Sequence, residues 1–253
     1  HTHIFTEQVV RDGYLALRLA QKGMTAADAM DALGDRYDEL VQEMEFSEEE
    51  SLSILRSTYP DAASFAVISI DLESSGLPVG AQGYMEQLEE LARLSDLYGD
   101  VVLPFFSVDP RRENVLNLAH HYVEDRDFVG LAIYPPLGFM PFDRRLLPLY
   151  EYAAENELPV IAQCSPECVR LPDPLPQDLE SMVSEGIVHL PDDDDHAAEL
   201  PDLVVAEYFG HPMHYDYVAS RFPDLKLCLS HGGGSGEWEA HPASTVHFAM
   251  RNW

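Results

Sequence analysis

Basic residues are scarce in this 253-residue chain, where 15 Lys and Arg stand against 45 Asp and Glu for a formal net charge of −30. Only two of the basic residues are lysines, Lys22 and Lys226. Nucleic acids and anionic membrane surfaces both require clustered Lys and Arg, so this composition excludes them as partners. An acidic shell of this kind is typical of proteins at high salt, and an acidic protein at ordinary salt is the alternative.

Cysteine and long apolar runs are scarce as well. The three cysteines, Cys164, Cys168 and Cys228, are too few and too far apart for a structural zinc site or a disulfide framework. Reduced thiols in a cytoplasmic protein are therefore expected. No stretch approaches the roughly 20 apolar residues of a membrane helix, and no signal peptide is visible. With 46% hydrophobic residues, the chain still has the composition of a folded protein.

The first part of the chain is expected to be helical. The first five residues, HTHIF, have the pattern of the end of a strand, and residues 6–61 are expected to form a helical insertion after it. Within this insertion, Ser47 and Glu50 have the spacing of a capping box, which predicts a helix that runs to Tyr59.

From Phe65 onward, short apolar segments alternate with amphipathic ones. Strands are predicted at Phe65–Glu73, Val101–Asp109, Phe128–Leu137, Pro159–Ser165 and Leu225–Ser230. Helices are predicted at Gly83–Gly99, Arg111–Glu124, Asp143–Asn156 and Pro212–Phe222. This alternation indicates βα units and a parallel sheet covered by helices. With the opening strand, six units are visible, and residues 1–253 are expected to form one domain.

Functional groups of parallel α/β folds lie at the carboxyl ends of the strands. His1 and His3 are two apart on a strand, so both side chains point to one face and could hold a divalent ion. His231 ends the last strand before three glycines. It is predicted to face the same cavity as a general acid/base or carbonyl polariser, and a capped strand with a tight turn is the alternative.

Other polar residues also follow the strands, and each alone is more often a satisfied group at a barrel rim than a catalyst. They are Asp71, Glu73, Asp109, Tyr134, Gln163 and Cys164. His211 is a candidate for facing the site from a later loop. Arg111 or Arg112 could pair with a substrate carboxylate, unless they are surface charges at a helix start. Motifs of serine esterases and nucleotide-binding proteins are absent.

Several segments together resemble the amidohydrolase superfamily, in the amidohydrolase-related branch that includes amino-carboxymuconate-semialdehyde decarboxylase. They are HTHIF, FFSVDPR, GLAIYPPLGF, PVIAQCSP and FGHPMHYDYVASRFPDLKLCLSHGGG. The resemblance covers the first five residues and most of the chain from Phe65 onward. Its most specific part runs from Tyr208 to Gly234, and the helical insertion lies outside it.

The resemblance implies a distorted (β/α)8 barrel with a divalent metal. It places His1 and His3 at the first-strand metal ligands and His231 at the histidine that activates water or the substrate. Gln163 stands where the family usually has a histidine ligand, and an amide oxygen is a poorer zinc ligand than imidazole. The eighth-strand aspartate has no counterpart, and the last two βα units are expected to lie outside this sequence, as in an excerpt of a longer barrel.

Three functions are compatible with this resemblance. The first is a metal-dependent hydrolase acting on a small-molecule amide, ester or lactone, with zinc expected and manganese or iron as alternatives. Its expected residues are His1, His3 and Gln163 at the metal, His231 as the catalytic group, and Tyr134, His211 and Arg111 at the substrate. The second is a nonoxidative decarboxylase of the same branch, and the third is a metal-free, non-enzymatic relative. A small molecule is the expected partner, and a homodimer is left open.

Overall fold

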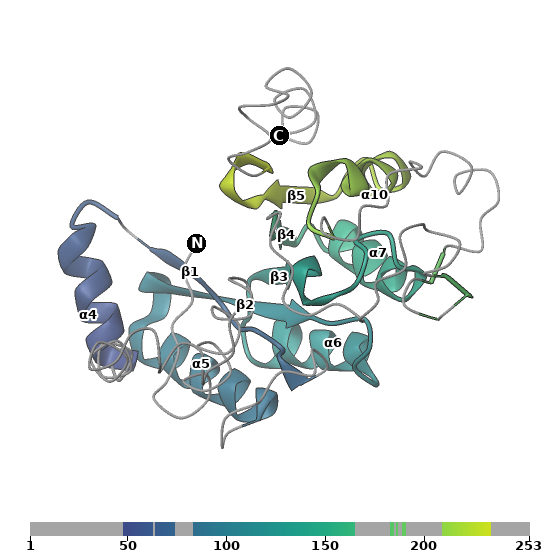
Figure 1. Ribbon diagram of the computed structural model, residues 1–253. Helices are drawn as coiled ribbons and strands as arrows, with labels where there is room; N and C mark the ends of the chain where they lie inside the picture. Colours follow the sequence, from purple (N-terminus) through teal and green to yellow (C-terminus); the bar gives the residue numbers. More distant parts are fainter. Residues whose placement is uncertain are drawn as a thin grey trace, which may run out of the picture.

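The computed structural model describes residues 48–62, 64–73, 83–164, 183–184, 186, 189–190 and 209–233. Five parallel strands form one sheet, in which each strand pairs with the next along the chain. They are β1 (Phe65–Ile68), β2 (Val102–Val108), β3 (Gly130–Ile133), β4 (Pro159–Ala162) and β5 (Lys226–Leu229). The sheet curls as half of a (β/α)8 barrel does (Figure 1), and the predicted α/β class is confirmed.

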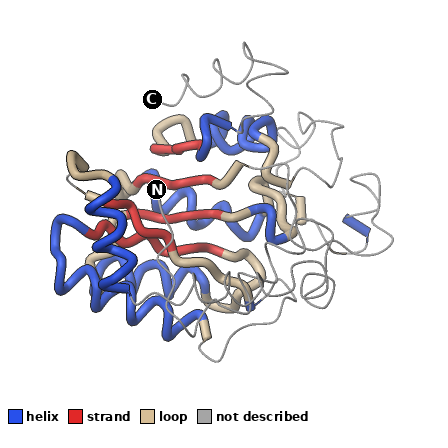
Figure 2. Tube along the Cα trace, turned by 60° about the vertical axis from the view of Figure 1, so that its left-hand side comes forward, coloured by secondary structure: helices blue, strands red, loops and turns tan. Residues whose placement is uncertain are grey.

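Helices occupy the connections between successive strands, because parallel neighbours require a crossover. The α-helices are α4 (Glu48–Thr58), α5 (Tyr84–Tyr98), α6 (Val115–Asp125), α7 (Leu147–Glu155) and α10 (Asp216–Arg221). The 3-10 helices are η2 (Gly99–Val101), η3 (Pro135–Leu137), η4 (Arg144–Leu146), η6 (Pro212–Tyr215) and η7 (Ser230–Gly233). Figure 2 shows the strands as a layer of their own beside these helices. None of the described helices is long and apolar enough to cross a membrane.

The two faces of the sheet carry separate apolar clusters. The larger cluster packs the helices against the sheet and includes Leu88 of α5, which is completely buried. The smaller cluster lies on the other face and takes one residue from each of β1 to β4: Ile68, Phe105, Ala132 and Ile161. A layer of side chains from neighbouring strands is typical of the interior of a (β/α)8 barrel. This interior face therefore leads to the strand ends, where functional groups are expected.

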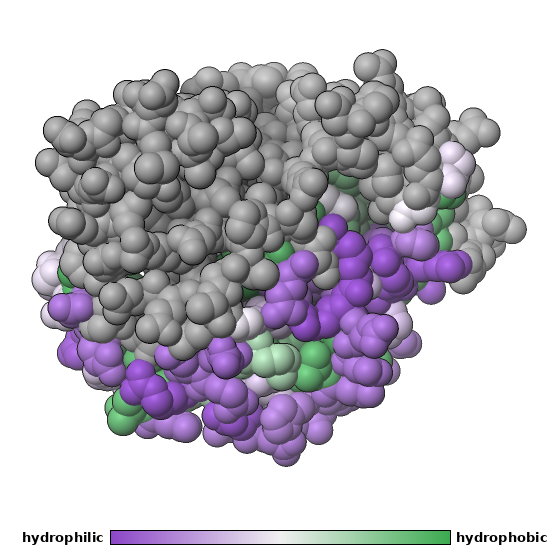
Figure 3. All heavy atoms as spheres, turned by 60° about the horizontal axis from the view of Figure 1, so that its bottom comes forward, coloured by the Kyte–Doolittle hydropathy of each residue, from purple (hydrophilic) through white to green (hydrophobic). Residues whose placement is uncertain are grey.

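The described surface is mainly hydrophilic. On the face shown in Figure 3, hydrophilic side chains dominate the coloured part, and the apolar ones form small separate patches. Among the described residues, basic side chains pair with carboxylates, for example Arg93 with Glu49 and Arg126 with Glu89. This distribution agrees with the strong acidic excess of the sequence.

The predicted strands and helices from Phe65 onward that fall on described residues are confirmed except at some of their ends. The helix predicted from Arg111, with Pro110 before it, begins only at Val115. The reason is local: the carboxylate of Asp109 accepts a hydrogen bond from the backbone N–H of Arg111, and Asn114 has a left-handed φ of 57°. The strand predicted over Phe65–Glu73 ends at Ile68.

Some predictions fall on other parts of the chain. The opening strand, most of the insertion over 6–61 and the predicted ligands His1 and His3 lie outside the described residues. The count of six βα units and the single domain over 1–253 therefore stay predictions. The end of the insertion is described, and α4 lies where the capping box predicts a helix.

Candidate functional site

A small, partly open pocket lies at the carboxyl ends of the strands. Its described lining combines an apolar floor with hydrogen-bonding residues. The floor consists of Ile68, Ala132, Ile133 and Ile161, and the polar lining of Ser107, Tyr134, Gln163 and Ser230. Four strands and the segment after β5 contribute to it. This is the position at which (β/α)8 barrels place their active sites.

Gln163 enters this pocket from the end of β4. Its backbone is held, because its N–H donates to the carbonyl of Ile133 at 2.9 Å and its carbonyl accepts from the Tyr215 hydroxyl at 3.4 Å. Within the described part of the chain, its side-chain amide makes no hydrogen bond. A fixed backbone with an uncommitted amide is well suited to contact a ligand.

Ser230 enters the pocket from the end of β5, as the first residue of η7. It is only 4% exposed, and its Oγ has no hydrogen-bond partner among the described residues. A buried hydroxyl without a partner is unfavourable, because folding removes its hydrogen bonds to water. Sequence reasoning did not single out this residue, although its place next to His231 at a strand end was a usable signal.

His231 directly follows Ser230 and is exposed. Its φ of 55° lies in the left-handed region, which is unusual for a residue other than glycine. The described pocket lining contains Ser230 and not His231. The catalytic role of His231 therefore stays a prediction, made from its position at the end of β5.

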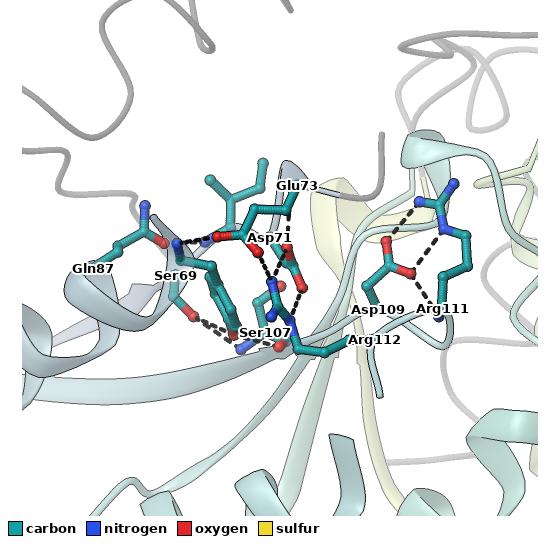
Figure 4. A network of polar contacts seen from close by, with 10 residues as sticks. Ser69, Asp71, Glu73, Gln87, Ser107, Asp109, Arg111 and Arg112 are labelled. Carbon is teal, nitrogen blue, oxygen red and sulfur yellow. Dashed lines mark hydrogen bonds and ion pairs between the residues drawn. The ribbon is translucent and has the colours of Figure 1, made fainter. Parts of the chain in front are cut away.

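Two arginines after β2 are engaged by buried carboxylates, as Figure 4 shows. The guanidinium of Arg112 donates to both carboxylate oxygens of Asp71, at 2.8 Å from Nη2 and through Nε. The same Nη2 donates to Glu73 at 2.7 Å, and the guanidinium lies over the ring of Tyr84 at 4.7 Å. The Asp71 side chain is 0% exposed, so Arg112 compensates a charge that water cannot reach.

The two carboxylates of this cluster respond differently to their surroundings. Burial raises the pKa of Asp71, although the ion pair with Arg112 opposes the change. Burial also acts on Glu73, but the hydrogen bond from the backbone of Tyr84 and the contacts with Arg112 together lower its pKa. Of the two carboxylates, Asp71 therefore depends more on Arg112 for its negative charge.

Arg111 is engaged in the same way by Asp109. Its Nε and Nη2 donate to the two carboxylate oxygens at 2.9 and 2.6 Å, and Nη2 also donates to the carbonyl of Leu137. Arg145 binds Asp143 with the same two-residue spacing and the same two distances. The prediction that strand-end carboxylates are satisfied rim groups is confirmed for Asp71, Glu73 and Asp109.

A hydrogen-bonded group of side chains fixes the end of β2 beside the pocket. The Tyr84 hydroxyl donates to the carbonyl of Ser107, and the Ser107 N–H donates to Ser69 Oγ at 2.9 Å. Ser69 Oγ in turn donates to the carbonyl of Phe105 at 3.2 Å. Burial raises the pKa of Tyr84 well above its usual value, so the phenol stays a donor. These bonds (Figure 4) fix Ser107, which is part of the pocket lining.

The remaining predicted residues divide between the pocket and its surroundings. Tyr134 lines the pocket. His211 lies just before η6 and is partly buried, with its ring 5.8 Å from that of His214. It is not part of the described pocket lining. Burial raises the pKa of the Cys164 thiol, and Cys164 and Cys228 are both free cysteines.

A comparison with protein families identifies the family of this chain. A family model described as "Amidohydrolase" matches residues 79–248, which is more than half of the chain. The chain belongs to the amidohydrolase family. The resemblance predicted from the strand-end motifs is thereby confirmed. This assignment supports a hydrolase-like enzyme of the superfamily and leaves the substrate open.

Two solved structures are similar to this amidohydrolase chain. An uncharacterized TIM-barrel protein from Bordetella bronchiseptica has 21% sequence identity and a TM-score of 0.47, over 81% of this chain and 58% of that one. A 4-oxalomesaconate hydratase from Rhodopseudomonas palustris has 17% identity and a TM-score of 0.44, over 93% of this chain and 64% of that one. The chain thus spans about 58 to 64% of their lengths. No significant match was found among curated proteins.

Amidohydrolases generally use divalent metals, which raises the question of what this chain offers as ligands. Among the described residues, no three His, Cys, Asp or Glu side chains form a group that could hold an ion. The carboxylates at the ends of β1 and β2 are occupied by Arg112 and Arg111. Gln163 offers one amide oxygen, a donor that fits a hard cation better than zinc. The expectation of a metal therefore depends on His1 and His3, outside the described residues.

Proposed function

We propose that this amidohydrolase is a metal-dependent hydrolase acting on a neutral small molecule with an amide, ester or lactone bond. One observation carries the choice of a neutral substrate. The described polar residues of the pocket, Ser107, Tyr134, Gln163 and Ser230, are all uncharged. Uncharged donors and acceptors bind an acyl group through hydrogen bonds without the desolvation that an anion would require.

The arginines after β2 support the same choice. Arg111 and Arg112 are the cations that a substrate carboxylate would need, and each is already paired with a buried aspartate. Taking either guanidinium away from its partner would leave a buried carboxylate uncompensated, which is strongly unfavourable. The net charge of −30 also disfavours anionic ligands.

The proposed roles follow the positions of the residues. His1, His3 and Gln163 would hold the ion, which when bound supplies Lewis-acid activation of water or of the substrate carbonyl. His231, at the end of β5, would transfer a proton to or from the reacting groups. Tyr134 would contact the substrate from the end of β3, with His211 as a proposed outer contact, while Arg111 would stay paired with Asp109. We also propose a cytoplasmic location and a homodimer.

The test compares matched neutral and anionic compounds. Aromatic esters, lactones and amides would be followed by acid release, and the corresponding aromatic carboxylates by CO2 release, with Zn2+ or Mn2+ present. We expect hydrolysis of neutral compounds and no CO2. Release of CO2 from the carboxylates would instead identify a nonoxidative decarboxylase, and a folded protein inert towards both series would identify a non-enzymatic relative.

A further inference from the structure

Ser230 combines two properties that no other described residue shares. Its Oγ is buried without a hydrogen-bond partner in the described part of the chain, and the residue lines the strand-end pocket. Two other side chains have such atoms, Nε2 of Gln87 and Oε2 of Glu90, and neither residue is in the described pocket lining. A buried polar atom without a partner, in a residue that lines a pocket, is available to a ligand.

Other buried hydroxyls show how this fold normally treats such groups. Ser69 Oγ contacts the N–H of Ser107 and the carbonyl of Phe105, at 2.9 and 3.2 Å. The Tyr150 hydroxyl donates to the carbonyl of Pro141 at 2.8 Å. Ser230 is thus an exception within its own fold, and such local exceptions tend to lie at functional sites.

We propose that Ser230 is a substrate-binding residue, whose Oγ–H donates a hydrogen bond to the carbonyl oxygen of the neutral substrate. The assignment rests on the proposed function and names the group that recognises the acyl unit. Ser230 directly follows β5 and is only 4% exposed, so its side chain needs little ordering when a ligand binds. Gln163, from the neighbouring strand β4, offers the second uncommitted polar group of the same wall.

The first test needs no substrate. Ser230→Ala removes a hydroxyl that the folded protein does not satisfy, so we expect its Tm to be unchanged or to rise by about 3 °C. Ser69→Ala is the matched control, because it removes a hydroxyl that is hydrogen-bonded to Ser107, Phe105 and Tyr84. Its Tm should fall by about 3 °C or more. An equal fall in both variants would overturn the proposal, since Ser230 would then be an ordinary structural hydroxyl.

The second test measures binding with two small probes of nearly the same shape. Acetamide and acetate would be titrated into the full chain and followed by protein-detected NMR. We expect acetamide to shift signals at Ser230 and Gln163, and acetate to leave them unchanged. The Ser230→Ala variant should bind acetamide roughly two- to tenfold more weakly, the loss expected for one hydrogen bond. Equal affinity in the variant, or preference for acetate, would contradict the assignment.

The two proposals can fail separately. If the protein hydrolyses neutral compounds and Ser230→Ala keeps the same kcat/KM, the hydrolase stands and the role of Ser230 is wrong. If no hydrolysis is found but acetamide binding depends on Ser230, the binding assignment stands and the hydrolase is wrong. With both correct, Ser230→Ala should gain stability or keep it while kcat/KM falls, a combination that loss of structure would not produce.

Discussion

Replacement of Arg112 by methionine is the perturbation whose size can be worked out most completely from the structure. The change removes three charged hydrogen bonds, two to Asp71 and one to Glu73, and the contact with the ring of Tyr84. Methionine retains much of the apolar stem, so the charge is the main loss. Asp71 is completely buried and would keep only the hydrogen bond from the backbone N–H of Glu73, with no positive charge beside it.

Removal of one partner from a buried ion pair typically lowers stability by about 3 to 5 kcal/mol. The Arg112 side chain is 14% exposed and that of Asp71 0%, so the upper part of this range applies. A domain has only about 5 to 15 kcal/mol in total, and the variant should therefore be close to unfolding. The matched control is Arg93→Met, whose ion pair with Glu49 is about half exposed on both sides (49% and 47%). That change should lower stability by about 0.5 kcal/mol or less.

The loss in Arg112→Met should also depend on pH. Because burial raises the pKa of Asp71, the folded protein binds this proton more tightly than the unfolded chain. The stability that Asp71 contributes therefore falls as the pH rises from the ordinary Asp pKa to the raised pKa of the folded protein. It returns when the pH is lowered again. Without Arg112 the pKa of Asp71 rises further, so the deficit relative to the wild type should be smaller at about pH 5 than at about pH 8.

Urea unfolding at the two pH values measures these differences directly. The double variant Asp71→Asn/Arg112→Met should recover part of the lost stability, because no buried charge is left. If Arg112→Met lost no more stability than Arg93→Met at either pH, the interpretation of Asp71 as a buried charge held by Arg112 would be refuted.

Three further predictions concern packing and the proposed chemistry. Gly130→Ala should lower stability by about 2 kcal/mol or more in urea unfolding, since its Cβ would lie 2.5 Å from the Pro159 carbonyl oxygen. The control is Ser95→Ala, which loses only one weak hydrogen bond to the carbonyl of Val102. Leu88→Ala should lower the free energy of unfolding by about 2 to 5 kcal/mol, because Leu88 is completely buried. Leu97 is 60% exposed, so Leu97→Ala should change it by no more than about 0.5 kcal/mol, and equal losses would contradict the core assignment. His231→Asn, a residue that tolerates left-handed φ, should keep the Tm and lower kcat/KM by about 100-fold or more; retained activity would remove His231 from the mechanism.

The fold could be predicted because its signals are local. The helix predicted over Gly83–Gly99 is α5, at Tyr84–Tyr98, since its apolar spacing and terminal glycine lie in one short segment. The start of α6 could not be predicted in the same way. Pro110 pointed to an earlier start, but the carboxylate of Asp109 holds the Arg111 backbone outside the helix.

The site could be predicted only in outline. Strand-end reasoning identified Tyr134 and Gln163, and both line the pocket. It did not reveal that Arg112 pairs with Asp71, because the two residues are 41 positions apart and nothing local links them. Nor did it identify Ser230, whose importance depends on the absence of a partner in three dimensions and not on its residue type.

The central claim, a metal-dependent hydrolase of neutral compounds, is tested most directly by elemental analysis of the protein purified without chelator, combined with ester, lactone and amide hydrolysis on the same sample. The account predicts about one equivalent of a divalent metal, with both metal and hydrolysis lost in the His1→Ala/His3→Ala variant. Hydrolysis that persists in metal-free protein, or a folded sample that neither binds Zn2+ or Mn2+ nor hydrolyses any neutral compound, would contradict it.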